Sequence, residues 1–284
     1  MPSARQVILQ YHQDGISRKN LQLMIAKIKS LRREDIAFNM ENIHLNYSEM
    51  TAFLEMLDRH KKNEPLSKIL NNKPFWNNEF YVNGDVLDPR PETELIIEMI
   101  LSQFDRQSCL NFLDIGTGSG CILLSLLLEY KKSHGVGIDI SADAIAIAKH
   151  NQKKICVAAS FFTVDWRDFE CERKFDIIVA NPPYIKADDI PKLEENVRNY
   201  DPQLALDGGA SGLNAYISII PLLRKWLKPD GSVFFEIGHG QAEDVSQILR
   251  SNCFQVDAIK KDLGNIDRII KSRACHSSDL SFQT

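Results

Sequence analysis

Residues 175–184 read Phe175-Asp176-Ile177-Ile178-Val179-Ala180-Asn181-Pro182-Pro183-Tyr184, an apolar run that ends in a polar turn. Five of the first six residues are apolar, which is typical of a strand buried on both faces of a parallel sheet. The turn follows the carboxyl end of that strand, where open α/β sheets bind their ligands. This stretch therefore predicts an α/β fold with a functional turn after the strand.

The turn combines a rigid backbone with hydrogen-bond acceptors. Pro182 and Pro183 fix two φ angles and remove two N–H donors. The Asn181 side-chain oxygen and the Pro182 carbonyl are left as acceptors, and we expect Tyr184 to form an aromatic wall beside them. Such acceptors suit the –NH2 group of a planar nitrogen compound. A proline-rich turn without function is the alternative, because short motifs recur by chance.

A glycine-rich turn lies upstream, between a strand-like run at Leu110–Asp114 and an apolar helix that starts at Cys121. Glycine lets the backbone approach a ligand closely. The spacing is not that of a dinucleotide fingerprint, since Cys121 occupies the position of its third glycine. The pattern instead fits a ligand without pyrophosphate whose cationic or amino-acid end lies near Asp114. The predicted ligand-binding residues here are Asp114, Gly116, Thr117, Gly118, Ser119 and Gly120.

Two further strand ends complete this pocket. Asp139 ends the run Val136–Asp139, and a carboxylate at that place can accept hydrogen bonds from both hydroxyls of a ribose. Asp165 follows the next run and can accept an adenine amino proton, while the Trp166 indole packs on the ring. Together with Asn181, these residues describe an adenosine pocket without phosphates. We therefore expect the cofactor to be S-adenosylmethionine.

The chain resembles the class I S-adenosylmethionine-dependent methyltransferases and, within them, the HemK/PrmC family of release-factor glutamine methyltransferases. The resemblance covers about residues 64–271. It rests on these segments: Pro89-Arg90-Pro91-Glu92-Thr93-Glu94, Asp114 to Gly120, Asp139, Asp165-Trp166, Asn181-Pro182-Pro183-Tyr184-Ile185, Asp201-Pro202, Ala205-Leu206-Asp207-Gly208-Gly209 and Asp267-Arg268. The N-P-P-Y motif alone is shared with adenine-N6 DNA methyltransferases, whereas P-R-P-E-T-E is narrower.

The resemblance implies methylation of the side-chain amide nitrogen, N5, of the glutamine in the Gly-Gly-Gln loop of class I peptide chain release factors. The implied catalytic residues are Asn181, Pro182 and Tyr184. The implied substrate-binding residues are Asn181, Pro182, Pro183, Tyr184 and Arg90. Two acceptors that bond both N–H groups would favour pyramidalisation of the amide nitrogen and stabilise the charge that leaves it. No side-chain base is expected.

The implied fold is a seven-stranded sheet, mostly parallel, with an antiparallel C-terminal hairpin. We expect a small all-α domain at residues 1–65 that recognises the substrate, because amphipathic helices begin near Ser17 and Ser48. Asn-rich turns predict a β-hairpin linker at residues 66–87. The methyltransferase domain is expected at residues 88–273 and a flexible tail at residues 274–284.

Composition excludes several functional classes. A net charge of −4 and a pI of about 6.0 argue against a surface that binds nucleic acid directly. No apolar run approaches the length of a membrane span, and scattered cysteines without C-x-x-C fit a reducing cytoplasm. The histidines lack metal-binding spacing, so we expect no metal. We also expect a monomer.

Three readings remain open. The first is methylation of a release factor. The second keeps the same chemistry on a ribosomal-protein glutamine or, less well supported by the acidic pI, on a DNA adenine. The third is an adenosine-binding module without activity, against which the intact Asn181 and glycine loop argue.

Overall fold

The structure is a computed structural model that describes residues 1–275. The chain divides into two compact units between Asn72 and Lys73. The predicted boundary at residue 65 and the start of the linker hairpin at residue 66 are wrong. Leu66–Leu70 forms helix α5, and its Leu66 and Leu70 pack against the core of the first unit. The hairpin is confined to β1 (Lys73–Phe75) and β2 (Asn78–Phe80).

The first unit is all-helical, as predicted. Its other helices are α1 (Ala4–His12), α2 (Arg18–Lys29), α3 (Arg33–Asn39) and α4 (Tyr47–Lys61). Ser17 caps α2 as expected, because its side chain accepts a hydrogen bond from the Asn20 backbone N–H. Helix α4 starts after Asn46 rather than at Ser48, since Asn46 and Glu49 cap each other reciprocally at 2.9 and 2.8 Å.

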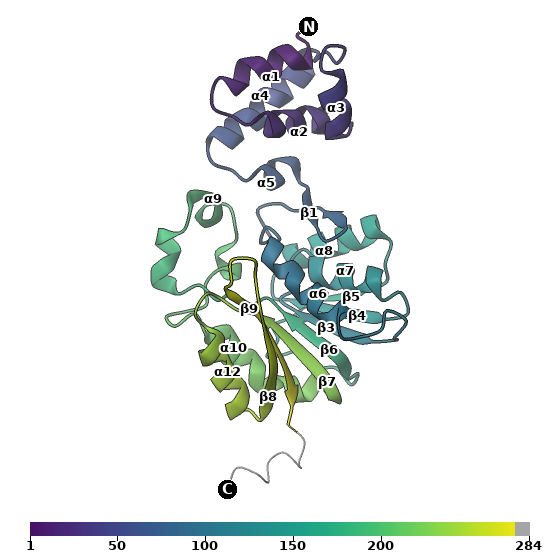
Figure 1. Ribbon diagram of the computed structural model, residues 1–284, viewed down its shortest axis with the longest axis vertical. Coiled ribbons are helices and arrows are strands. Elements are labelled where there is room, and N and C mark those ends of the chain that lie inside the picture. Colours follow the sequence, from purple (N-terminus) through teal and green to yellow (C-terminus); the bar gives the residue numbers. More distant parts are fainter. Residues whose placement is uncertain (276–284) are drawn as a thin grey trace. The chain divides into compact units, whose positions relative to one another are not determined.

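The second unit contains a seven-stranded sheet (Figure 1). Its strands are β3 (Asn111–Ile115), β4 (His134–Asp139), β5 (Ser160–Thr163), β6 (Phe175–Ala180), β7 (Leu227–Glu236), β8 (Phe254–Lys261) and β9 (Asp267–Ala274). The spatial order is β5-β4-β3-β6-β7-β9-β8. The first five strands in this order are parallel, and β9 is antiparallel to both of its neighbours, β7 and β8. The predicted fold class is confirmed.

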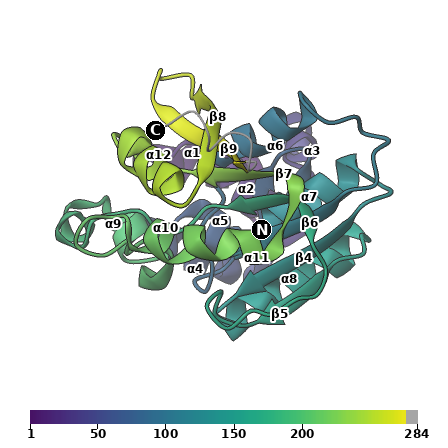
Figure 2. The same cartoon turned by 90° about the horizontal axis from the view of Figure 1, so that it is seen from below.

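Helices cover both faces of this sheet (Figure 2). One face packs against α6 (Glu94–Leu101, preceded by the 3-10 turn η1 at Pro91–Thr93), α7 (Cys121–Glu129) and α8 (Ala142–Ile155). The other packs against α10 (Asn214–Ile219), η4 (Ile220–Leu222), α11 (Leu223–Trp226) and α12 (Ala242–Ser251). Alternate residues of each strand serve the two layers. In β6, Ile177 and Val179 join the first core, while Ile178 and Ala180 join the second.

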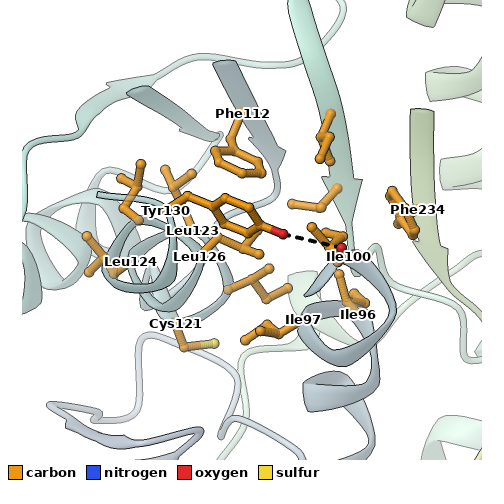
Figure 3. Packing of buried hydrophobic residues seen from close by; sticks show 14 of the residues in the cluster. Ile96, Ile97, Ile100, Phe112, Cys121, Leu123, Leu124, Leu126, Tyr130 and Phe234 are labelled. Atoms are coloured by element: carbon orange, nitrogen blue, oxygen red, sulfur yellow. Dashed lines mark hydrogen bonds between the residues drawn. The ribbon is translucent and has the colours of Figure 1, made fainter. Parts of the chain in front are cut away.

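Figure 3 shows part of the first core, where the one polar atom of a buried tyrosine is satisfied. Tyr130 is fully buried after α7, and its hydroxyl donates to the carbonyls of Ile100 at 3.3 Å and Phe104 at 3.0 Å. A buried hydroxyl is costly without such partners. The bond therefore joins the end of α7 to the end of α6, the helix that follows P-R-P-E-T-E.

Short helices connect β6 to β7. They are η2 (Ala187–Lys192), α9 (Glu195–Arg198) and η3 (Gln203–Ala205), followed by α10, η4 and α11. The helical segment from Asn214 to Trp226 is divided at η4, which contains Pro221, because proline has no N–H to donate. Strand β9 includes Ala274, the first residue of the predicted tail, and residues 276–284 lie outside the described part. Within residues 1–275, no helix has the length and hydropathy to cross a membrane.

The sheet topology fixes where a ligand would bind. The chain runs from β3 outward to β4 and β5, then crosses to β6 on the other side of β3. The carboxyl ends of β3 and β6, at Ile115 and Ala180, are direct neighbours in the sheet. Open α/β sheets bind ligands at such a reversal of strand order. The glycine turn and the N-P-P-Y turn therefore meet there.

Candidate active site

A cavity of about 380 Å³ opens at this reversal of strand order. Its volume lies in the range of roughly 300–1,000 Å³ that small-molecule sites occupy. The predicted site residues that line it are Gly116, Gly118, Asp139, Trp166, Asn181, Pro182 and Pro183. They come from the turns after β3, β4, β5 and β6, as the sequence predicted.

The glycine turn needs glycine for two different reasons. Gly116 and Gly118 have φ of +70° and +54°, and an added Cβ would meet no protein atom within 4 Å at either. Their lack of a side chain leaves bare backbone toward the cavity in a conformation that other residues rarely adopt. Gly120 does not line the cavity. A Cβ there would lie 3.2–3.4 Å from Leu124, Ala148 and Phe161, so Gly120 allows close packing of α7.

Asp114, Thr117 and Ser119 lie behind the turn rather than in the cavity. The Thr117 hydroxyl donates to Asp114 Oδ2 at 2.7 Å, and the Ser119 carbonyl accepts from the Asn151 amide at 3.0 Å. Asp114 is fully buried and its Oδ1 has no hydrogen-bond partner within the described residues. Burial raises the pKa of Asp114 to about 7. Its role is to hold the turn through Thr117, and no direct contact with the cavity supports the predicted role beside a cationic ligand end.

Asp139 reaches the cavity from the end of β4 and retains free acceptor capacity. Its Oδ2 accepts from the Gly118 N–H and its Oδ1 from the Ser141 N–H, both at 2.9 Å. An ionised carboxylate has about four acceptor sites, so roughly two remain. Burial raises the pKa of Asp139, and hydrogen bonds from the backbone of Ser141, Gly118 and Ile140 oppose that rise. This geometry suits a vicinal diol, as expected for a ribose.

Trp166 and Asp165 take different positions. Trp166 lines the cavity, and its Nε1 donates to Ser218 Oγ of α10 at 2.8 Å, which fixes the indole plane. Asp165 does not line the cavity. Both of its oxygens accept hydrogen bonds from Arg167, which lowers the pKa of Asp165. The prediction that Asp165 accepts an adenine amino proton is therefore not supported, because Arg167 already occupies its carboxylate.

Asn181 and Pro182 lie at the cavity as predicted. Asn181 Nδ2 donates to Thr93 Oγ1 at 3.2 Å, so the amide nitrogen faces Thr93. Its Oδ1 accepts no hydrogen bond from the described residues. Proline has no N–H to donate at positions 182 and 183. The end of β6 thus presents acceptors to the cavity.

Tyr184 does not form the predicted aromatic wall. Its ring packs against the second core, and its hydroxyl donates to Glu236 Oε1 at 3.4 Å. Burial, followed by the nearby Glu236 charge, raises the pKa of Tyr184. The Tyr184 side chain is thus directed toward Glu236 on β7 and does not line the cavity. The only aromatic side chain lining the cavity within residues 1–275 is Trp166.

Arg90 is also outside the cavity. Its Nη2 donates to Asp201 Oδ2 at 2.6 Å, and the Asp201 side chain is 1% exposed. A buried carboxylate requires a cationic partner. This geometry gives no support to the predicted substrate-binding role of Arg90: Arg90 joins P-R-P-E-T-E to the segment after N-P-P-Y.

Sequence reasoning missed two buried residues behind Asn181. Thr93 lies inside P-R-P-E-T-E, where only Arg90 was predicted to act at the site. Glu236 ends the apolar strand β7 and is 1% exposed. An acidic residue at a strand end was the signal that identified Asp114 and Asp139, and it applies equally to Glu236. Ile140 and Leu204, both exposed, also line the cavity and carry no polar signal.

The residues at the cavity fit S-adenosylmethionine. Bare glycine backbone, a carboxylate with spare acceptor sites and an indole face are three features that an adenosine group uses. Arg167 is the only lysine or arginine among the described residues that line the cavity, and it is paired with Asp165, so the site is compatible with a sulfonium cation. Asp139, Gly116, Gly118 and Trp166 would hold the cofactor.

Comparisons with known proteins agree with this fit. Residues 92–198 match the family model described as "Methyltransferase small domain". Over 228 residues the chain is 38% identical to the release factor glutamine methyltransferase of Caulobacter vibrioides, which covers 80% of this chain and 79% of that protein. It is 34% identical over 287 residues to the bifunctional methyltransferase of Rickettsia felis, covering 90% of this chain but 54% of that protein. The chain thus spans about half the length of the second relative.

A solved structure of a methyltransferase from Pyrococcus furiosus has a TM-score of 0.54 to this chain at 14% sequence identity. The match covers 78% of this chain and 99% of that protein. At this identity the likeness shows the fold alone.

Proposed function

The chain belongs to the family of release factor glutamine methyltransferases, and on that premise we propose that it methylates N5 of the glutamine in the Gly-Gly-Gln loop of class I peptide chain release factors. The resemblance drawn from the sequence motifs is confirmed. The enzyme uses S-adenosylmethionine.

The arrangement of Asn181 carries the proposal. Its Nδ2 is engaged by Thr93, which leaves Oδ1 as an acceptor beside the Pro182 carbonyl at the cavity. A primary carboxamide has two N–H donors, so two acceptors match it. An amide carbonyl or a carboxylate in the same position would meet only acceptors. This selectivity favours a glutamine side chain as the methyl acceptor.

The chemistry follows from how these acceptors act on nitrogen. A carboxamide nitrogen is a weak nucleophile because its lone pair is delocalised into the carbonyl group. When bound, S-adenosylmethionine supplies an electrophilic methyl group: the nitrogen lone pair forms the N–C bond, the S–C electron pair goes to sulfur, and one N–H proton leaves to water. Asn181 and Pro182 hold both N–H groups, which favours pyramidal nitrogen and stabilises its developing positive charge. Orienting the nitrogen also lowers the barrier.

The experiment is methyl transfer from isotope-labelled S-adenosylmethionine to purified candidate substrates, followed by mass spectrometry of the modified peptide. The substrates are a class I release factor, the same factor with its Gly-Gly-Gln glutamine replaced by alanine, ribosomal proteins and duplex DNA. We expect label only on that glutamine. Label on a ribosomal-protein glutamine or on adenine instead would contradict the substrate and support one of the alternative readings.

The proposal extends to the first unit and to the setting of the enzyme. We assign recognition of the release factor to Met1–Asn72, which carries the exposed aromatics Phe38 and Tyr47 at 87% and 89% exposure. A net charge of −4 supports an enzyme that does not bind nucleic acid directly. A monomer in the cytoplasm, where release factors act, completes the proposal.

A further inference from the structure

Asn181 is backed by a buried cluster that the proposed chemistry does not yet use. Thr93 is 2% exposed and accepts the Asn181 Nδ2 hydrogen bond at 3.2 Å. Glu236, at the end of β7, is 1% exposed, and its Oε1 accepts a hydrogen bond from the Tyr184 hydroxyl. Its other oxygen, Oε2, is buried and has no hydrogen-bond donor placed on it within the described residues.

The hydroxyl proton of Thr93 and the Oε2 atom of Glu236 are complementary. Thr93 accepts from Asn181, which leaves its own hydroxyl proton for another acceptor. A hydrogen bond from the Thr93 hydroxyl to the Glu236 carboxylate lowers the pKa of Glu236. A hydroxyl rotates freely and has one proton, whereas an ionised carboxylate only accepts. The Thr93 proton therefore points to Glu236, and a lone pair of Thr93 points to Asn181.

We propose that Glu236, acting through Thr93, is a positioning residue that determines which side-chain atom of Asn181 faces the cavity. An ionised Glu236 accepts a hydrogen bond from the Thr93 hydroxyl, so Asn181 must turn its NH2 group toward Thr93 and its oxygen toward the substrate. A protonated Glu236 donates to Thr93 instead. Thr93 then donates to Asn181 Oδ1, and the amide turns its NH2 group to the cavity, where it opposes the N–H groups of the substrate.

This inference rests on the proposed function, because only an amide donor makes the orientation of Asn181 matter. The titratable groups that face Glu236 come from five other elements: Arg268 on β9, Glu92 in η1, Tyr184 after β6, Cys121 at the start of α7 and Tyr216 on α10. Burial raises the pKa of Glu236 to about 7, while Thr93, Arg268 and Tyr184 oppose the rise. The correctly oriented state is thus present above pH 7 and is lost as the pH falls through 7.

The test is the pH dependence of single-turnover methyl transfer to a release factor at saturating S-adenosylmethionine, for four variants. We expect the wild-type rate to fall at least about ten-fold between pH 8 and pH 6, with a midpoint near 7. Thr93→Ser, which keeps the hydroxyl, should show the same profile. In Thr93→Val and Glu236→Gln the fall in rate below pH 7 should be absent. At pH 8, Thr93→Val should be about ten-fold slower than the wild type, which is the effect of one lost hydrogen bond.

Ser272→Ala serves as the matched control, because Ser272 is a fully buried hydroxyl on β9 without a partner among the described residues. It should retain the wild-type profile. Melting temperatures and calorimetric affinities for S-adenosylmethionine show that each variant is folded and loaded. A second readout needs no activity: the ¹⁵N-labelled side-chain amide of Asn181 should shift with a midpoint near pH 7 in the wild type and not in Glu236→Gln.

The outcomes separate the two proposals. If the wild-type enzyme does not methylate the release factor, the proposed function is wrong. The titration of the Asn181 amide then still tests whether Glu236 orients Asn181 through Thr93. If the wild-type enzyme methylates the release factor, and the rates of Thr93→Val and Glu236→Gln fall below pH 7 as the wild-type rate does, the positioning role is wrong and the proposed function stands. A flat wild-type profile overturns the positioning role as well.

Discussion

The turns after β3 and β6 are neighbours in the sheet and have opposite chemistry. The turn after β3 contains Gly116 and Gly118, with positive φ and no side chain toward the cavity. The turn after β6 contains Pro182 and Pro183, which have fixed φ and no N–H group. The first suits a large ligand that lies against bare backbone. The second suits a small group that must meet acceptors at fixed positions.

Both turns are supported by a buried carboxyl group through a threonine. Asp114 accepts from Thr117 behind the first turn, and Glu236 lies beside Thr93 behind the second. Thr117 and Thr93 support different parts of the site. Thr117 belongs to the glycine turn itself and holds its shape, whereas Thr93 reaches from η1 to the side chain of Asn181. We therefore expect changes at the first turn to affect cofactor affinity and changes at the second to affect the rate of transfer.

The largest effect is expected for Asn181→Asp. The carboxylate keeps an acceptor but cannot donate to Thr93, and it places a second negative charge near Glu236. The loss of transition-state stabilisation should be about 3 kcal/mol, or roughly 10²-fold in single-turnover rate. Quenched-flow measurement at saturating cofactor checks this. A rate near that of the wild type would show that Asn181 acts as an acceptor alone and that its bond to Thr93 is dispensable.

Asp139→Ala should weaken S-adenosylmethionine binding by about 1–3 kcal/mol, because the hydroxyls of the ribose would lose their acceptor and the Gly118 N–H its partner. Titration calorimetry measures the affinity directly. At saturating cofactor the transfer rate should change much less. Unchanged affinity would contradict the assignment of Asp139 to the ribose.

Glu236→Gln should stabilise the fold at high pH, although it loses the acid limb of the rate. Burial raises the pKa of Glu236 from 4.5 to about 7, so the favourable contribution of the protonated group is complete below 4.5 and is lost as pH rises through 7. The variant should therefore exceed the wild type by on the order of 2 kcal/mol at pH 8 and by almost nothing at pH 4. Urea unfolding at both pH values tests the sign. A wild type more stable than the variant at pH 8 would contradict it.

Gly118→Ala should cause the smallest change in stability. A Cβ at Gly118 meets no protein atom within 4 Å, so the cost is the positive φ alone, about 1 kcal/mol. Gly15→Ala is the matched control, since Gly15 also has a positive φ of +85° with nothing within 4 Å and lies in the helical unit. Thermal unfolding should show similar losses for both. Calorimetry should show weaker cofactor binding for Gly118→Ala only, and equal binding by both variants would mean that the turn does not approach the ligand.

The sequence predicted the strands and the ligand-binding edge because both depend on local pattern. The apolar run before Asn181 and the acids that end β3 and β4 mark buried parallel strands, and their carboxyl ends must meet at one edge. The pattern places Asn181 and Asp139 at this edge because Asn181 directly follows β6 and Asp139 is the last residue of β4. The strand ends at the cavity could thus be predicted, whereas the part of the lining that comes from segments such as Asp85–Leu87 and Asn214–Ser218 could not.

The direction of a side chain outside a strand depends on its hydrogen-bond partners, and most of these partners are distant in the sequence. Asp165 is hydrogen-bonded to Arg167, Tyr184 to Glu236 on β7, and Arg90 to Asp201. The last two pairs are separated by 52 and 111 residues. Thr93 was missed for the same reason, since its contact with Asn181 spans 88 residues.

The most direct test of the account is Asn181→Ala, measured for both cofactor affinity and single-turnover transfer to the release factor, beside Asp139→Ala. The account predicts that Asn181→Ala loses about 10²-fold or more in transfer and retains most of its affinity for S-adenosylmethionine. Asp139→Ala should show the reverse. An Asn181→Ala enzyme that transfers methyl at a near-normal rate would contradict the central claim that the acceptors after β6 activate the glutamine nitrogen.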